Sequence, residues 1–140
     1  MFEYIKGSLK DLTPEKAILE TAGLGYKILI PLSVYSNLLG KESDIKLYIS
    51  AVYREDSQRL FGFLSKDQRD LFEKICDISG IGPKIALIII GHLDETALYL
   101  SIQNQDVKSL TRVPGLGKKT AERLIIELKD KFENNLSENR

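Results

Sequence analysis

The chain repeats itself once, and this repeat limits the possible folds more than any other feature of its 140 residues. Gly80–Ala86 (G-I-G-P-K-I-A) aligns with Gly115–Ala121 (G-L-G-K-K-T-A) at an offset of 35 residues. Each copy follows a short helical pattern, Leu71–Asp77 or Asp106–Leu110, and opens a longer one. Repetition at a fixed offset indicates a duplicated supersecondary unit. The sequence therefore predicts two helix–hairpin–helix units in tandem.

The residue types in each copy suit the binding of a phosphate group. Glycine adopts a positive φ without steric cost, and its missing Cβ lets a phosphate oxygen approach the backbone N–H groups. The next helix points its unpaired N–H groups and the positive end of its dipole at the same place. Lysines in that first turn oppose the dipole, so an incoming phosphate explains them better than helix stability does. We expect Ile81 and Leu116, between the glycines, to fix each hairpin to its own core. The predicted DNA-binding residues are Gly80, Gly82, Lys84, Gly115, Gly117, Lys118, Lys119 and Arg123.

The residues argue against three other interpretations of the glycines. An ordinary helical hairpin would use them only to turn, but two copies with a lysine after the second glycine argue against this. A dinucleotide fingerprint needs a third glycine after a strand, and Ile85 and Thr120 stand in its place. A P-loop has the pattern G-x-x-x-x-G-K-[ST]. With Gly117-Lys118 as its G-K, the first glycine is replaced by Arg112 and the Ser or Thr by Lys119. No ATP site and no cofactor are therefore expected, and modules of the helix-hairpin-helix type contact phosphates without reading bases.

The chain has no net charge, but one stretch of it has an excess of basic residues. Lys plus Arg number 20 and Asp plus Glu number 20, which gives a net charge of zero. An excess of cations usually supplies affinity for DNA. Between Lys108 and Arg123, however, five basic residues face one acid, Glu122, for a net charge of +4. Any DNA contact is therefore expected on a local patch.

The first part of the chain is predicted to form a small barrel. Five short strands are expected at Tyr4–Lys10, Lys16–Thr21, Tyr26–Ile30, Ile45–Val52 and Arg59–Phe63. Strand order alone does not separate an OB-fold from other small barrels. At Ser65 the period changes to 3.6, and Ser65 with Gln68 forms a capping box. The predicted class is α+β: a β-barrel domain over residues 1–64, then an all-α domain over 65–140 whose polar end, Asn134–Arg140, is expected to fray.

The loop Tyr53-Arg54-Glu55-Asp56-Ser57 is by itself most simply a solvated turn. Together with the barrel, the G-I-G-P-K segment and the P-G-L-G-K-K-T-A-E-R-L segment, however, it resembles the RuvA family of Holliday-junction-binding proteins, from Met1 to about Phe132. The resemblance implies an OB-fold barrel and a tetramer, or an octamer of two plates, that holds a four-way junction open and square. It implies that Glu55 and Asp56 form an acidic pin that repels phosphates, with Arg54 as a basic neighbour at the junction centre. Carboxylates beside phosphates reduce binding, so they suit a place from which DNA is excluded.

The same resemblance implies partners for recombination, DNA repair and the SOS response. In this family the RuvB motor ATPase drives branch migration, and the RuvC resolvase is a further partner. Family members continue into a linker and a third helical domain that contacts RuvB. The 140 residues end before such a domain, which puts motor recruitment by this chain in doubt but leaves the expectation of junction binding unchanged.

Two alternative functions stay open. A nuclease could use the R-E-D loop as a metal site, although two carboxylates are few for one. A generic module could hold single strands on Tyr48, Tyr53 or Phe61. Cys76 is expected to be a buried structural thiol, and His92 a helix-capping or surface residue with no zinc partner. Without an apolar signal segment, a cytoplasmic protein is expected.

Overall fold

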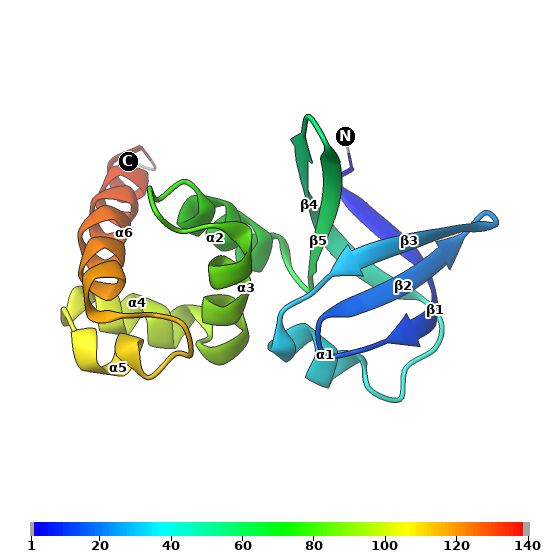
Figure 1. The fold of residues 1–140 in the computed structure, drawn as a ribbon, viewed down its shortest axis with the longest axis horizontal. Helices are drawn as coiled ribbons and strands as arrows, with labels where there is room; N and C mark the ends of the chain where they lie inside the picture. The colour runs from blue at the N-terminus through cyan, green and yellow to red at the C-terminus, as the bar shows by residue number, and fades with distance from the viewer. Residues whose placement is uncertain (1, 139–140) are drawn as a thin grey trace. The chain divides into compact units, whose positions relative to one another are not determined.

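The computed structural model describes residues 2–138, and describes side chains as far as Glu133. The chain forms two compact units, one ending at Asp70 and one beginning at Leu71. Figure 1 shows that the first unit carries the strands and the second carries most of the helices.

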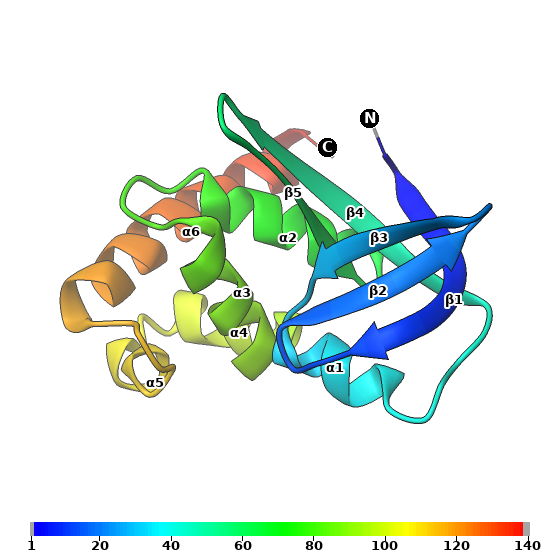
Figure 2. The same ribbon diagram turned by 45° about the vertical axis from the view of Figure 1, so that its right-hand side comes forward.

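Five strands of the first unit close into a barrel in the order β1-β2-β3-β5-β4. Their bounds are β1 Tyr4–Leu12, β2 Lys16–Thr21, β3 Leu24–Leu29, β4 Ile45–Arg54 and β5 Ser57–Phe63. All neighbours pair antiparallel except β3 and β5, whose short parallel ladder joins Ile28 to Leu60 and Leu29 to Phe61. Figure 2 shows this closure from the side of β2 and β3. The predicted small closed barrel is confirmed.

Alternation along the strands directs one set of apolar side chains into the barrel. The fully or almost fully buried members of this core include Ile5, Ala17, Leu19, Ile28, Leu47, Ile49, Phe61 and Phe63. At about 25 cal/mol for each Å² of apolar surface removed from water, such burial is the main stabilising contribution to a unit of this size.

One element of the barrel unit was not predicted from the sequence. Helix α1, Leu32–Leu38, follows Pro31 and buries Val34 and Leu38, which lie four residues apart on one helical face. A helix of seven residues gives a weak periodic signal, so the segment was interpreted within a run of strands. The strands also differ at their ends: β4 and β5 reach Arg54 and Ser57, further along the hairpin than expected.

The helices that follow the barrel lie in the second unit, except for the first residues of α2, which belong to the first unit. Their bounds are α2 Lys66–Cys76, α3 Pro83–His92, α4 Glu95–Gln103, α5 Val107–Thr111 and α6 Lys118–Glu138. The core of the second unit repeats at the offset of 35 residues. The buried pairs are Ile75 and Leu110, Ile78 and Val113, Ile81 and Leu116, Ala86 and Ala121, Ile89 and Leu124, and Ile90 and Ile125. The duplication seen in the sequence is therefore a duplication of packing.

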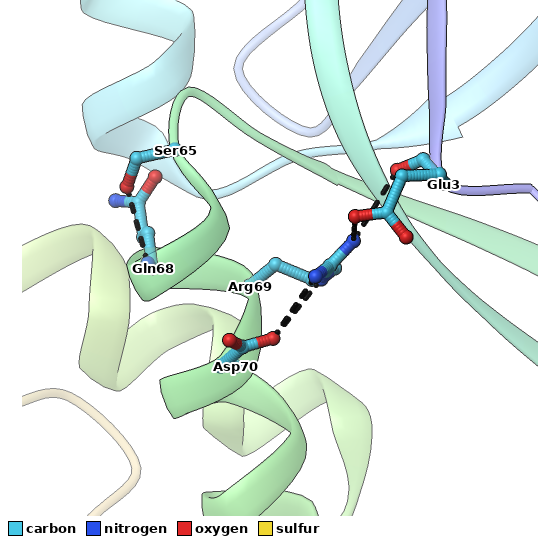
Figure 3. A network of polar contacts seen from close by, with 5 residues as sticks. All are labelled: Glu3, Ser65, Gln68, Arg69 and Asp70. Atoms are coloured by element: carbon cyan, nitrogen blue, oxygen red, sulfur yellow. Dashed lines mark hydrogen bonds and ion pairs between the residues drawn. The ribbon is translucent and has the colours of Figure 1, made fainter.

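Helix α2 begins where the capping box predicts. The Ser65 hydroxyl accepts a hydrogen bond from the Gln68 N–H at 3.1 Å, and the Gln68 side chain accepts one from the Leu64 N–H at 3.2 Å. One residue further, Arg69 donates to the Glu3 carboxylate at 2.8 Å and also pairs with Asp70 (Figure 3). The hydrogen bond from Arg69 holds the pKa of Glu3 below its usual value. These contacts lie within the first unit, which ends at Asp70.

Helix α6 extends into the polar end of the chain. The helix continues through Asn134 to Glu138, because no glycine or proline interrupts the chain after Lys118; residues 139–140 lie outside the described residues. Within residues 2–138 no single helix is long and apolar enough to cross a membrane. Only α3 and α4 taken together reach that length and composition, with a bend of 100° between them.

Candidate nucleic-acid interface

The two hairpins have the same backbone geometry. The chain makes the same succession of turns over residues 77–82 and 112–117. In the first hairpin, the Ile81 N–H donates to the Ile78 carbonyl at 3.0 Å. In the second, the Leu116 N–H donates to the Val113 carbonyl at 3.1 Å. The predicted duplication therefore extends to individual hydrogen bonds in the turns.

The two glycines of each pair have different roles. Gly80 and Gly115 lie at φ +88° and +83°, a region that other residues adopt only with strain. Gly82 is extended, at φ −92° and ψ 176°, and Gly117 is not among the positive-φ glycines either. A Cβ built on Gly82 or Gly117 would have no atom of the chain within 4 Å. The turn therefore requires the first glycine, whereas the second leaves open space beside the helix that follows.

The residue between the glycines fixes each hairpin, as predicted. Ile81 is 4% exposed and Leu116 is 3% exposed. Their burial lets the flanking glycines stay at the surface, where both pairs are exposed. The buried residue thus anchors each turn to the core, while the glycines on either side of it are accessible to solvent.

The helices that follow the hairpins begin without a side-chain cap. Gly82, the N-cap of α3, has no side chain, and Gly117 stands in the same position before α6. Neither helix has an acid in its first turn. The first N–H groups of a helix have no carbonyl partner within it, so these two helix starts present donors to whatever approaches.

Lysines surround both helix starts. Lys84 and Lys119 occupy the same position at the offset of 35 residues, and Lys118 is the first residue of α6, where α3 has Pro83. All three lysines are exposed, and none forms an ion pair in the part of the chain that the structure describes. A cation next to uncapped N–H groups is unfavourable for the helix but favourable for an anion.

Arg123 lies at a contact between the hairpins that the sequence did not indicate. Its guanidinium donates to the main-chain carbonyl of Ser79 at 2.9 Å. A recess of about 330 Å³ is lined there by Ser79, Gly80, Lys119, Thr120 and Arg123. Arg123 thus belongs to the second hairpin by sequence and contacts the first in space.

The predicted pin residues lie on the β4–β5 hairpin of the first unit. Glu55 and Asp56 form its two-residue turn, with Arg54 paired to Ser57 beneath it, and the side chains of Arg54, Glu55 and Asp56 are exposed. β4 pairs with β1 only as far as Tyr48. The outer end of the hairpin is therefore a two-stranded arm, as Figures 1 and 2 show.

The aromatic residues suggested for single-strand binding do not form one platform. Phe61 is 1% exposed and belongs to the barrel core, so it cannot stack on a base. Tyr48 packs edge-on against Tyr4 with ring centroids 6.3 Å apart, and Lys46 lies over both rings. Tyr53 is exposed and pairs with Gln58 near the tip of the arm.

Cys76 and His92 are each explained by their immediate surroundings. Cys76, the last residue of α2, is half-buried and not fully buried as expected. Its partial burial raises the pKa of the thiol to about 11, so the thiol is protonated at neutral pH. The Nδ1 atom of His92 lies 2.9 Å from the Ile88 carbonyl oxygen at the end of α3, which is the predicted capping role. Among the side chains that the structure describes, no group of three or more His, Cys, Asp or Glu is arranged to hold a metal ion.

Comparison with known proteins identifies both halves of the chain. The RuvA N terminal domain matches residues 1–62, and the SAM-like Helix-hairpin-helix tandem matches residues 72–130.

Curated relatives named "Holliday junction branch migration complex subunit RuvA" match almost the whole chain. The protein of Protochlamydia amoebophila is 48% identical over 132 residues, which are 94% of this chain and 66% of the relative. That of Thermodesulfovibrio yellowstonii is 40% identical over 92% of this chain and 67% of the relative. That of Caldanaerobacter subterraneus subsp. tengcongensis is 44% identical over 94% and 70%. The chain spans about two thirds of the length of these relatives, and by identity and coverage it belongs to the RuvA family.

Proposed function

We propose that this chain binds four-way DNA junctions by gripping the phosphate backbones of their arms, without cleaving them. The observation that carries the proposal is the pair of hairpins with matching hydrogen bonds. Each exposes an uncapped helix start with an open glycine and a lysine beside it. The relatives' name connects the family with Holliday junctions and a branch migration complex.

Binding of this kind is selective for shape and not for sequence. Main-chain N–H groups and lysines contact phosphate oxygens, which are the same at every base pair. Two such hairpins on one helical unit fix two phosphate positions relative to each other. A substrate in which backbones follow the required path is then bound more tightly than one in which they do not.

The balance of charge is explained if several copies act together. The exposed basic stretch from Lys108 to Arg123 has a net charge of +4 in one chain. In a tetramer around one axis this stretch is repeated four times, so a local positive patch and not the net charge of the chain attracts the phosphates. We propose this tetramer, with an eight-subunit form as the alternative.

Glu55 and Asp56 serve in this proposal as the acidic pin. Their position on the tip of a two-stranded arm supports this role, because the carboxylates extend beyond the closed part of the barrel. Placed at the centre of a junction, they repel phosphates and keep the strands apart, while Arg54 sits beside them. The second glycines and Lys84, Lys118 and Lys119 hold the arms.

The chain is proposed to act as a non-catalytic subunit. ATP turnover belongs to the RuvB motor, and the RuvC resolvase is a further candidate partner, both acting on the junction in the cytoplasm. Whether the RuvB contact is made by these 140 residues is a separate question from junction binding, because the relatives are longer.

A competition experiment tests the proposal. A labelled four-way junction bound to the chain is challenged with unlabelled junction, duplex or single strand, and the mass of the complex is measured alongside. We expect the junction to compete best and the mass to correspond to four or eight chains. Better competition by single strands, or strand cleavage on addition of Mg²⁺ or Mn²⁺, would contradict the proposal.

A further inference from the structure

The first glycine of each hairpin lies beside a side chain from the second helix of the other hairpin. A Cβ built on Gly80 lies 3.2 Å from the Nη1 atom of Arg123, on α6. A Cβ built on Gly115 lies 3.4 Å from the Cδ1 atom of Ile85, on α3. The two phosphate-binding turns are therefore not independent, because each is bounded by the other's helix.

Only one of these two contacts is polar. Arg123 donates to the Ser79 carbonyl at 2.9 Å. At the offset of 35 residues, Arg123 corresponds to Ile88 and Ser79 corresponds to Pro114, so the repeat provides no second copy of this hydrogen bond. The first hairpin therefore depends on an interaction that the second does not have.

The carbonyl that Arg123 contacts sets the direction of a neighbouring N–H group. The Ser79 carbonyl and the Gly80 N–H belong to one planar trans peptide, so they point in opposite directions. Glycine on one side of this peptide allows its plane to rotate more freely than other residues would. A hydrogen bond to the carbonyl restricts that rotation and thereby orients the N–H.

We propose that Arg123 is a positioning residue that holds the first hairpin in its phosphate-binding geometry from the second hairpin. The two hairpins then act as one unit, and loss of Arg123 loosens a turn 44 residues away in the sequence. This inference rests on the proposed function for its effect on DNA, but its structural part is tested without DNA. The competing explanation is that Arg123 only contacts a phosphate directly, since a guanidinium has five N–H donors.

Amide hydrogen exchange in the DNA-free protein separates the two explanations. The Ile81 N–H and the Leu116 N–H make the same hydrogen bond in the two turns, so Leu116 is an internal reference for Ile81. In Arg123→Gln we expect exchange at Ile81 to accelerate about fivefold relative to Leu116, the loss expected for one net hydrogen bond. Arg123→Lys should restore part of the protection, because lysine keeps the charge and a donor.

Arg112→Gln is the matched control. Arg112 is an exposed cation of the same basic stretch that does not line the recess at Gly80. This variant removes one charge, so it should weaken junction binding only through its charge and leave the Ile81 exchange unchanged. Arg123→Gln should weaken junction binding more than Arg112→Gln at the same salt concentration.

Unchanged exchange at Ile81 in Arg123→Gln would overturn the inference, whatever the DNA affinity. Faster exchange with junction affinity equal to that of Arg112→Gln would also overturn it, because the turn would then not need to be held. If Arg123→Gln does not fold, Arg123→Lys is compared with wild type by the same exchange ratio. Failure of the wild-type chain to bind junctions would refute the proposed function but not the exchange result.

Discussion

Alanine in place of each hairpin glycine separates the folding role of these residues from their binding role. At Gly82 and Gly117 the backbone is not in the positive-φ region and an added Cβ meets no atom of the chain. Alanine is a poorer N-cap than glycine, but it also restricts the unfolded chain, and these two effects on stability oppose each other. We expect the free energy of unfolding to stay within about 1 kcal/mol of wild type.

The effect of the same changes on DNA binding should be much larger. The new methyl group of Gly82→Ala or Gly117→Ala occupies the space through which a phosphate oxygen would reach the backbone N–H groups. Loss of one charge-assisted hydrogen bond costs about 1.5–3 kcal/mol, so junction affinity should fall about ten- to hundredfold. Fluorescence anisotropy with a labelled junction at fixed salt measures this loss.

Gly115→Ala gives the opposite pattern of effects on stability. Its φ of +83° forces alanine into the left-handed region, which costs about 1–2 kcal/mol. The melting temperature of the helical unit should fall by about 4–8 °C for each kcal/mol. If Gly82→Ala and Gly117→Ala remain as stable as wild type and still bind the junction with wild-type affinity, phosphates do not approach at these glycines and the reasoning is wrong.

Three further outcomes follow from the same geometry. Lys118→Gln with Lys119→Gln should weaken binding equally for all DNA sequences and reduce the salt slope by roughly two per subunit, measured by titration at several salt concentrations; an unchanged slope places these lysines off the DNA. Glu55→Gln with Asp56→Asn should keep or tighten junction binding while reducing discrimination against duplex, and a clear weakening would contradict the pin assignment. Cys76, with a thiol pKa of about 11, should react slowly with iodoacetamide at pH 7, and its rate should rise only as the pH approaches that value; rapid modification of the folded protein at pH 7 would contradict this.

The features predicted well from the sequence are those fixed by local chemistry. The two hairpins follow from glycines, a buried apolar residue and an N-terminal lysine at one offset, and each of these acts within a few residues. The capping box at Ser65 and Gln68 is equally local, and the structure contains its first hydrogen bond. The residue pattern of five short strands was sufficient to predict a barrel, which the structure contains.

The features that were missed depend on tertiary contacts. Helix α1 is too short to show a period, and packing of Val34 and Leu38 in the barrel stabilises it. The hydrogen bond from Arg123 to Ser79 joins residues 44 positions apart, where the two repeats differ in sequence, so the repeat pattern gives no signal for it. The first and second glycines of each hairpin also differ in backbone angle, and this difference is not visible in the sequence because both residues are glycine.

The central claim is tested most directly by four dissociation constants of this chain. Two are for four-way junctions of unrelated sequence, and two are for duplexes, one with the sequence of an arm of each junction. All four are measured at one salt concentration. If the hairpins grip phosphates along a junction's path, the two junctions should bind equally and both should bind at least tenfold more tightly than either duplex. Unequal binding of the two junctions, or junction affinity no higher than that of duplex, would contradict the account.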